Sequence, residues 1–168
     1  MVIKIKICGM KFPDNISEIA SFQPDYLGFI FYEKSPRNFE KKKPNLPESI
    51  QKVGVFVNAS LDEIEEKVKQ YDLDLVQLHG DESPEFCLLL QQNKFKVIKA
   101  FSIDNKFNFN TLNNYINYCD YFLFDTKGTN YGGNGITFDW SVLENYKDRK
   151  STRLNSSHLR LSRMPSSA

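Results

Sequence analysis

The chain has none of the long apolar runs that mark a membrane protein. Its longest apolar stretches fall far short of the roughly 20 residues that a membrane-spanning helix needs. The N-terminus alternates apolar and basic residues, where a signal peptide would have a continuous apolar block. With a formal net charge of +1, there is also no overall excess of positive charge to favour nucleic acid or a membrane surface. We therefore expect a soluble, cytoplasmic protein with no membrane and no nucleic acid as partner.

Cysteine is scarce as well. The three cysteines, Cys8, Cys87 and Cys119, form an odd set without the paired spacing of a metal site, and this indicates a reducing compartment. Of the 168 residues, 40% are hydrophobic and 26% are charged, which suits one soluble domain with a sizeable core.

A strand–helix rhythm fills residues 1–148. The pattern predicts strands at residues 3–7, 26–31, 53–57, 73–78, 96–101 and 121–124. It predicts helices at residues 16–22, 61–70 and 85–92, a weaker one at 108–118, and a further one opening at Asp139 and Trp140. Between residues 31 and 52 we expect a short or distorted helix, because Pro44 and Pro47 interrupt the segment.

This alternation favours an α/β fold with a parallel sheet. The strands recur about every 20 to 25 residues, as in a repeating βα barrel. An open, doubly wound sheet has the same periodicity, so the spacing alone leaves both architectures open.

The last predicted strand ends in Asp125, and a glycine-rich loop follows it with Gly132, Gly133 and Gly135. An acid at the carboxyl end of a buried strand is how a parallel α/β enzyme presents a proton donor or acceptor. The glycines permit a backbone path that side chains would block. Alternatively, Asp125 caps a turn before an ordinary loop.

Three further residues stand near predicted strand ends. Cys8 ends the first strand. Its thiolate could act as a base or nucleophile, or the residue could be a small buried filler. Arg37 is the only arginine before residue 149. Its planar guanidinium could bind a carboxylate or phosphate, or it could be a surface cation. His79 follows the fourth strand, and we interpret it as a supporting wall residue in preference to a catalytic one.

Composition changes near the end of the chain. Residues 1–148 hold 17 of the 22 basic residues and all 21 acidic ones, a net charge of −4, so the last stretch carries +5. That stretch has no aromatic residue, although the preceding chain is rich in Phe and Tyr. We therefore predict an incomplete βα-barrel domain over residues 1–148 and a disordered, non-native tail over 149–168, in preference to a basic nucleic-acid-binding arm.

Taken together, these segments resemble the phosphoribosylanthranilate isomerase family of tryptophan biosynthesis. The matching segments stand in order along residues 3–147: Lys6-Ile-Cys-Gly9, Leu27-Gly-Phe-Ile-Phe31 with Ser35-Pro-Arg37, Val53-Gly-Val-Phe-Val-Asn58, Val76-Gln-Leu-His-Gly80, and Asp125 with Gly132-Gly-Asn-Gly135.

The resemblance implies an isomerase on a (β/α)8 TIM barrel, acting without a redox cofactor or metal. It would convert N-(5-phosphoribosyl)anthranilate into 1-(2-carboxyphenylamino)-1-deoxyribulose 5-phosphate by an Amadori rearrangement. By position, Asp125 would be the general acid and Cys8 the general base. Arg37 would hold the anthranilate carboxylate, and Gly132, Gly133 and Gly135 would help to bind substrate.

The sequence departs from the family in one respect. Only about six βα units are expected here, whereas the family has eight, with its phosphate site after the seventh and eighth strands. Two alternatives therefore stay open: an inactive barrel fragment or non-catalytic binding module, and another sugar-phosphate isomerase, which the pairing of Cys8 with Asp125 disfavours. Fusion to, or association with, a neighbouring enzyme of the pathway is also left open.

Overall fold

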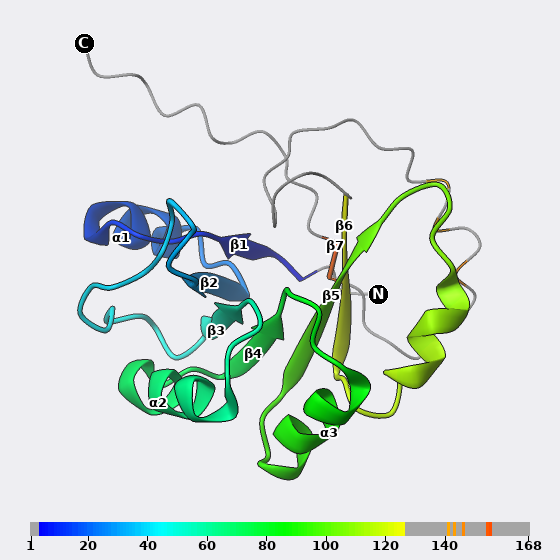
Figure 1. Ribbon diagram of the computed structural model, residues 1–168. Coiled ribbons are helices and arrows are strands. Elements are labelled where there is room, and N and C mark those ends of the chain that lie inside the picture. The colour runs from blue at the N-terminus through cyan, green and yellow to red at the C-terminus, as the bar shows by residue number, and fades with distance from the viewer. Residues whose placement is uncertain (1–3, 127–140, 142, 144–145, 147–153, 156–168) are drawn as a thin grey trace.

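A single parallel sheet organises the protein. The computed structural model describes residues 4–126, 141, 143, 146 and 154–155. Its strands are β1 (Lys6–Cys8), β2 (Tyr26–Phe31), β3 (Gln51–Phe56), β4 (Leu75–Leu78), β5 (Val97–Ile103), β6 (Tyr121–Thr126) and β7 (Leu154–Asn155). Every neighbouring pair is parallel, and the strands lie side by side in chain order. In Figure 1 the sheet curls progressively from β1 to β6.

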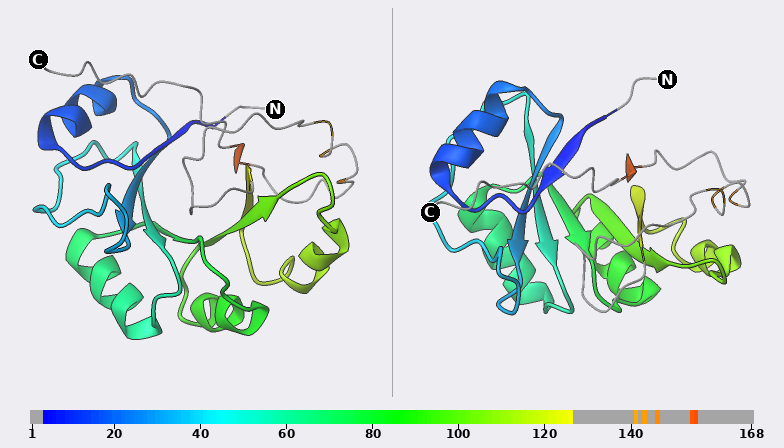
Figure 2. Two further views of the ribbon diagram at one scale, coloured as in Figure 1. Left: turned by 45° about the horizontal axis from the view of Figure 1, so that its top comes forward. Right: turned by 90° about the horizontal axis from the view of Figure 1, so that it is seen from above.

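The helices lie outside this curl. They are α1 (Pro13–Ser21), α2 (Leu61–Tyr71), α3 (Pro84–Gln92) and the 3₁₀ helix η1 (Phe109–Asn114). The left view of Figure 2 shows them arranged around the outer side of the strands. A doubly wound sheet would carry helices on both faces. The expected α/β barrel-type fold is therefore confirmed as a curved array of βα units. Over the described residues the helices cover only the outer face of the sheet, which a doubly wound sheet would not show.

Local sequence signals explain where two of the helices begin. Ser60 caps α2 in a reciprocal box: its Oγ accepts from Glu63 N at 3.3 Å, and Glu63 Oε2 accepts from Ser60 N at 2.7 Å. Ser83 caps α3 by accepting from Phe86 N, and Pro84 follows it as the first helical residue. Both caps fix the helices directly after the loops that leave the carboxyl ends of β3 and β4.

Alternate side chains of each strand point to opposite faces of the sheet, so the sheet has apolar packing on both faces. One cluster lines the inner, concave side of the sheet: Tyr26, Val53, Leu75, Ile98, Ala100 and Leu123. The residues between them face outward and pack against the helices, among them Leu27, Phe29, Phe56, Val76, Leu78 and Val97. Because the side-chain period of a strand is two residues, each later inner position can be found by counting in twos from the inner cluster.

The structure differs from the sequence prediction in two helices. Residues 32–50 contain no helix; the segment instead lays Phe39 against Phe29, with ring centroids 4.9 Å apart, and forms a bridge between Asn38 and Ile30. The weaker predicted helix at 108–118 is only the 3₁₀ helix η1. The residues at 105–118 include Asn105, Asn108, Asn110, Asn113 and Asn114, which favour turns and caps over helix interiors.

The end of the sheet also differs. No strand was predicted after residue 124, yet β7 pairs with β6 through Leu123–Leu154 and Phe124–Asn155. The backbone of these two residues continues the ladder of the sheet, and the disordered tail over 149–168 stays a prediction. The rest of the predicted tail, and the predicted helix start at Asp139 and Trp140, lie outside the described residues.

Candidate active site

Polar side chains replace apolar ones on the inner face as the strands reach their carboxyl ends. Asp125 comes two residues after Leu123 of the inner cluster, and Gln77 comes two residues after Leu75. His79 is the next inner position beyond Gln77. Cys8 pairs in register with Gly28, which pairs with the inner residue Val53. The inner face thus carries a thiol, an amide, an imidazole and a carboxyl group at one edge.

His79 and Asp125 are in contact across this edge. Nε2 of His79 lies 3.4 Å from Oδ2 of Asp125, and the two side chains are only 13% and 11% exposed. The sequence predicts His79 as a supporting wall residue, and the structure places it in contact with Asp125. Between them runs β5, in which Ser102 pairs with Asp125.

Cys8 occupies space that Gly28 leaves free. A β-carbon placed on Gly28 would lie 2.7 Å from Cys8 Sγ and 2.9 Å from Lys6 Nζ. Glycine at position 28 therefore allows the Cys8 thiol and the Lys6 ammonium to fold over the neighbouring strand. Lys6 belongs to the same segment as Cys8, although nothing in the sequence pattern singles it out.

The other two thiols lie elsewhere. Cys87 is buried in α3, and Cys119 precedes β6, at the opposite end of that strand from Asp125. A hydrogen bond to Cys87, together with burial, raises the pKa of Cys119 far above its usual value. The same hydrogen bond lowers the pKa of Cys87. Among the described cysteines, Cys8 is thus the thiol at the carboxyl-terminal edge.

Arg37 lies directly over the turn that follows Cys8. A β-carbon on Gly9 would lie 2.8 Å from Arg37 Cδ and 2.9 Å from its Nη1. Gly9 also has a φ of +88°, a conformation that favours glycine, and its N–H donates to Gly28 O at 3.0 Å. The structure therefore places Arg37 over Gly9, the residue next to Cys8, and its role in holding substrate stays a prediction.

Some residues around the site were missed from sequence. Gln77 is 2% exposed, and its Oε1 accepts no hydrogen bond from the described residues. Glu82 and Lys99 form a buried ion pair just behind His79, with Nζ–Oε2 of 3.0 Å. A signal did exist for Lys99, because it is the one charged residue in the largely apolar strand β5.

Part of the predicted site cannot be placed. Gly132, Gly133 and Gly135 lie outside the described residues. Within the part of the chain that the structure describes, no group of three or more His, Cys, Asp or Glu residues could hold a metal ion. No helix there has the length and hydropathy to cross a membrane.

The fold and this edge together define the class of protein: a βα-barrel protein that carries polar side chains at the carboxyl ends of its strands, where barrel enzymes hold their active sites. The sequence profile of the family N-(5'phosphoribosyl)anthranilate (PRA) isomerase matches residues 5–156. The chain belongs to this family, as its segments predicted.

Individual relatives agree with the family. The N-(5'-phosphoribosyl)anthranilate isomerase of Parabacteroides distasonis is 47% identical over 150 residues, covering 85% of this chain and 67% of its own. The crystal structure of phosphoribosyl anthranilate isomerase from Thermotoga maritima superposes with a TM-score of 0.78 at 34% identity, over 90% of this chain and 75% of that one. A further structure of the isomerase, in complex with reduced 1-(o-carboxyphenylamino)-1-deoxyribulose 5-phosphate, has a TM-score of 0.73 at 30% identity, over 90% of this chain and 74% of that one.

Proposed function

We propose that this chain is an isomerase that converts N-(5-phosphoribosyl)anthranilate into 1-(2-carboxyphenylamino)-1-deoxyribulose 5-phosphate in tryptophan biosynthesis. The observation that carries the proposal is the placement of Cys8 and Asp125 on one inner face, at the carboxyl ends of β1 and β6. Membership of the isomerase family supports it, as does a solved family member with a reduced product-like ligand.

Asp125 is the general acid of this proposal. Its protonated carboxyl gives a proton to the ribose ring oxygen while the bond between that oxygen and C1 breaks. The lone pair of the anthranilate nitrogen forms the C=N bond of the resulting Schiff base. The imidazole of His79, 3.4 Å from Oδ2, is placed to hold the orientation of the carboxyl group and to accommodate the carboxylate after proton transfer.

Cys8 is the general base. Its thiolate removes the proton from C2. The electron pair of that C–H bond forms the C1=C2 double bond while the π pair of the C=N bond returns to nitrogen, which gives an enolamine. A proton from solvent then adds at C1 as the C2 hydroxyl loses its proton to solvent, and the C2 carbonyl of the ketose forms. A protonated acid and a deprotonated base must coexist in one cavity, which requires different environments for the two groups. Asp125 contacts the His79 imidazole, whereas Cys8 and the Lys6 ammonium both lie beside Gly28, so the two groups have different neighbours.

Arg37 holds the anthranilate carboxylate through its guanidinium fork, at the turn beside Cys8. The glycine-rich loop with Gly132, Gly133 and Gly135 contributes backbone to substrate binding. No step of this chemistry calls for a cofactor or metal.

We also propose that the reaction takes place in the cytoplasm. The chain would divide into a barrel domain, residues 1–148, and a tail, residues 149–168.

The test is steady-state turnover of purified chain with N-(5-phosphoribosyl)anthranilate, with product separated by chromatography. Cys8→Ala and Asp125→Asn should each lower kcat by about 10²- to 10⁴-fold, the usual scale for loss of a general acid or base. Calorimetric titration with reduced 1-(o-carboxyphenylamino)-1-deoxyribulose 5-phosphate measures binding independently. Binding of this ligand without any turnover would instead indicate a non-catalytic binding module. A kcat near that of the parent chain in either variant would show that the substituted residue is not the general acid or base.

A further inference from the structure

The ion pair between Glu82 and Lys99 is buried on the outer side of the sheet. The two side chains are 3% and 4% exposed, and Nζ lies 3.0 Å from Oε2. Lys99 is two residues from each of the outward residues Val97 and Phe101 of β5, so its side chain shares their outward face, on the side of α3. A buried pair of this kind contributes little net stability, because desolvation offsets the Coulombic attraction. Its geometry suggests another role.

Both charges bind the backbone that follows β4. Gly80 N donates to the two Glu82 carboxylate oxygens at 2.9 and 3.1 Å. Lys99 Nζ donates to Gly80 O at 2.8 Å and to Ala100 O at 3.2 Å. The pair therefore holds Gly80 through its N–H and its carbonyl oxygen together.

The same carboxylate ties a second loop to this point. Glu82 Oε1 accepts from Asn58 N at 2.9 Å, and Asn58 Oδ1 accepts from Asp81 N at 2.7 Å. The approach is so close that a β-carbon on Gly80 would lie 2.7 Å from Asn58 Cγ and 2.8 Å from Asn58 N. The loops after β3 and β4 are thus locked into a single unit.

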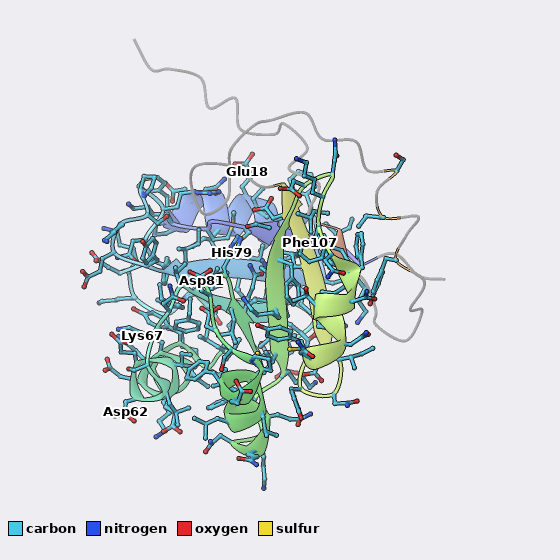
Figure 3. The ribbon with its side chains drawn as sticks, turned by 45° about the vertical axis from the view of Figure 1, so that its right-hand side comes forward. Glu18, Asp62, Lys67, His79, Asp81 and Phe107 are labelled. Carbon is cyan, nitrogen blue, oxygen red and sulfur yellow. The ribbon has the colours of Figure 1, made fainter. Side chains whose placement is uncertain are left out.

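His79 precedes Gly80 and is held by this unit. Its own N–H continues the ladder to β3 by donating to Phe56 O at 2.8 Å. The peptide on either side of its α-carbon is therefore bound, and the side chain reaches Asp125 from this fixed base. Figure 3 labels His79 and Asp81 near each other, in the segment that follows β4.

Lys99 connects the unit to the strand pair that carries the acid. It pairs with Leu78 of β4 on one side and with Phe122 of β6 on the other, three residues before Asp125. We propose that the buried Glu82–Lys99 pair is a positioning element, which fixes the loop after β4 relative to β6 and so holds the His79 imidazole against Asp125. This inference rests on the proposed function, in which Asp125 is the acid.

The main test replaces the pair with neutral groups. In Glu82→Gln/Lys99→Met no unpaired charge stays buried, so the fold should persist while the grip on Gly80 weakens. We expect kcat to fall by roughly 10²-fold, as for misplacement of a catalytic group by about 1 Å, with little change in KM. The matched control is Glu66→Gln/Lys67→Met, which removes an ion pair of 3.5 Å on the surface of α2 and should leave kcat unchanged.

A second measurement does not depend on turnover. The sequence has two histidines, His79 and His158, so imidazole nitrogen signals can be assigned by NMR with His158 as internal reference. Asp125→Asn should shift the His79 signals in the parent chain, because the two groups are in contact. In the Glu82→Gln/Lys99→Met background the same substitution should shift them much less.

A third variant covers the case in which that double variant does not fold. Asn58→Gly keeps the positive φ of +52° and removes the Oδ1 bond to Asp81 N. It should lower kcat and weaken the response of His79 to Asp125→Asn. A parent chain without turnover would contradict the proposed function but leave the NMR test of positioning intact. An unchanged His79 response in a folded variant, or wild-type kcat beside a lowered melting temperature, would show that the pair is purely structural.

Discussion

The imidazole of His79 contacts the carboxyl group of Asp125 across strand β5, with Nε2 and Oδ2 3.4 Å apart. The two residues stand at the carboxyl ends of β4 and β6, which both pair with β5 and not with each other. The contact is therefore made by side chains that reach over a whole strand. Its geometry depends on the curvature of the sheet and on the loop that carries His79.

The first prediction concerns this contact. His79→Ala should lower kcat by roughly tenfold, since side chains in contact are commonly coupled by about 0.5–3 kcal/mol and this contact with Asp125 is lost. The loss should be smaller than that from Asp125→Asn, because His79 assists the acid and does not replace it. Steady-state kinetics of the double variant decide the point. His79→Ala should cost nothing further in an Asp125→Asn background, whereas additive losses would show that the two residues act independently.

Arg37 should affect binding more than turnover. Arg37→Ala should raise KM by roughly tenfold or more with a small change in kcat, because a charged hydrogen bond to the substrate carboxylate is lost. Arg37→Lys should recover only part of the affinity, since an ammonium lacks the planar fork. Lys34→Ala, a change at an exposed residue of the same loop, is the control. An unchanged KM in Arg37→Ala would reduce Arg37 to a surface cation.

The capping box of α2 should make stability depend on pH. Hydrogen bonds from the backbone N–H and then the hydroxyl of Ser60 hold the pKa of Glu63 below its usual value of 4.5. The ionised carboxylate therefore stabilises the folded chain above that value, and the contribution disappears as pH falls through the lower folded-state pKa. Glu63→Gln should lower the free energy of unfolding by about 0.5–1 kcal/mol at pH 7 and by little at pH 3.

Urea unfolding at the two pH values measures this difference. Glu66→Gln, in the same helix but outside the capping box, is the control and should show no comparable pH dependence. Equal destabilisation by Glu63→Gln at pH 7 and pH 3 would mean that the Glu63 charge has no part in the cap.

The sequence predicted the strands well because local signals and burial agree there. The apolar runs around Leu27, Val53 and Phe122 are strands, and Cys8 and Asp125 stand at strand ends as expected. The helix predicted at residues 108–118 is longer than the observed 3₁₀ helix η1, because turn-forming asparagines compete there with a weak helical periodicity. Apart from η1, the element ends differ from the predicted ones by at most three residues, and β2 has the predicted bounds, since side-chain pattern fixes a strand's face more firmly than its limits.

The tertiary contacts of the site were beyond the sequence. The partnership of His79 with Asp125 spans 46 positions and depends on how far the sheet curls. The sequence did not single out Glu82, because no local pattern shows that it pairs with Lys99. Counting in twos from the buried residues of β4 would have placed Gln77 and His79 on one face, and this signal was available.

The last prediction separates the position of the Cys8 thiol from general stability. Gly28→Ala would place a methyl group 2.7 Å from Cys8 Sγ, so the thiol must move. Gly54→Ala is the matched control, because its methyl group would meet Phe56 Cε2 at 2.7 Å and Leu73 on the outer side of the sheet. Both variants should lose stability, since overpacking a core costs about 1–3 kcal/mol.

Only Gly28→Ala should also lower kcat in the fraction that stays folded. A displaced base meets the C2 proton in poor geometry, and an error of about 1 Å costs roughly 10²-fold in rate. Melting temperatures identify conditions under which both variants are folded, and kinetics at those conditions give kcat per folded molecule. If Gly54→Ala lowers kcat as much as Gly28→Ala, the loss reflects a general disturbance of the sheet, and the space over Gly28 has no special importance for Cys8.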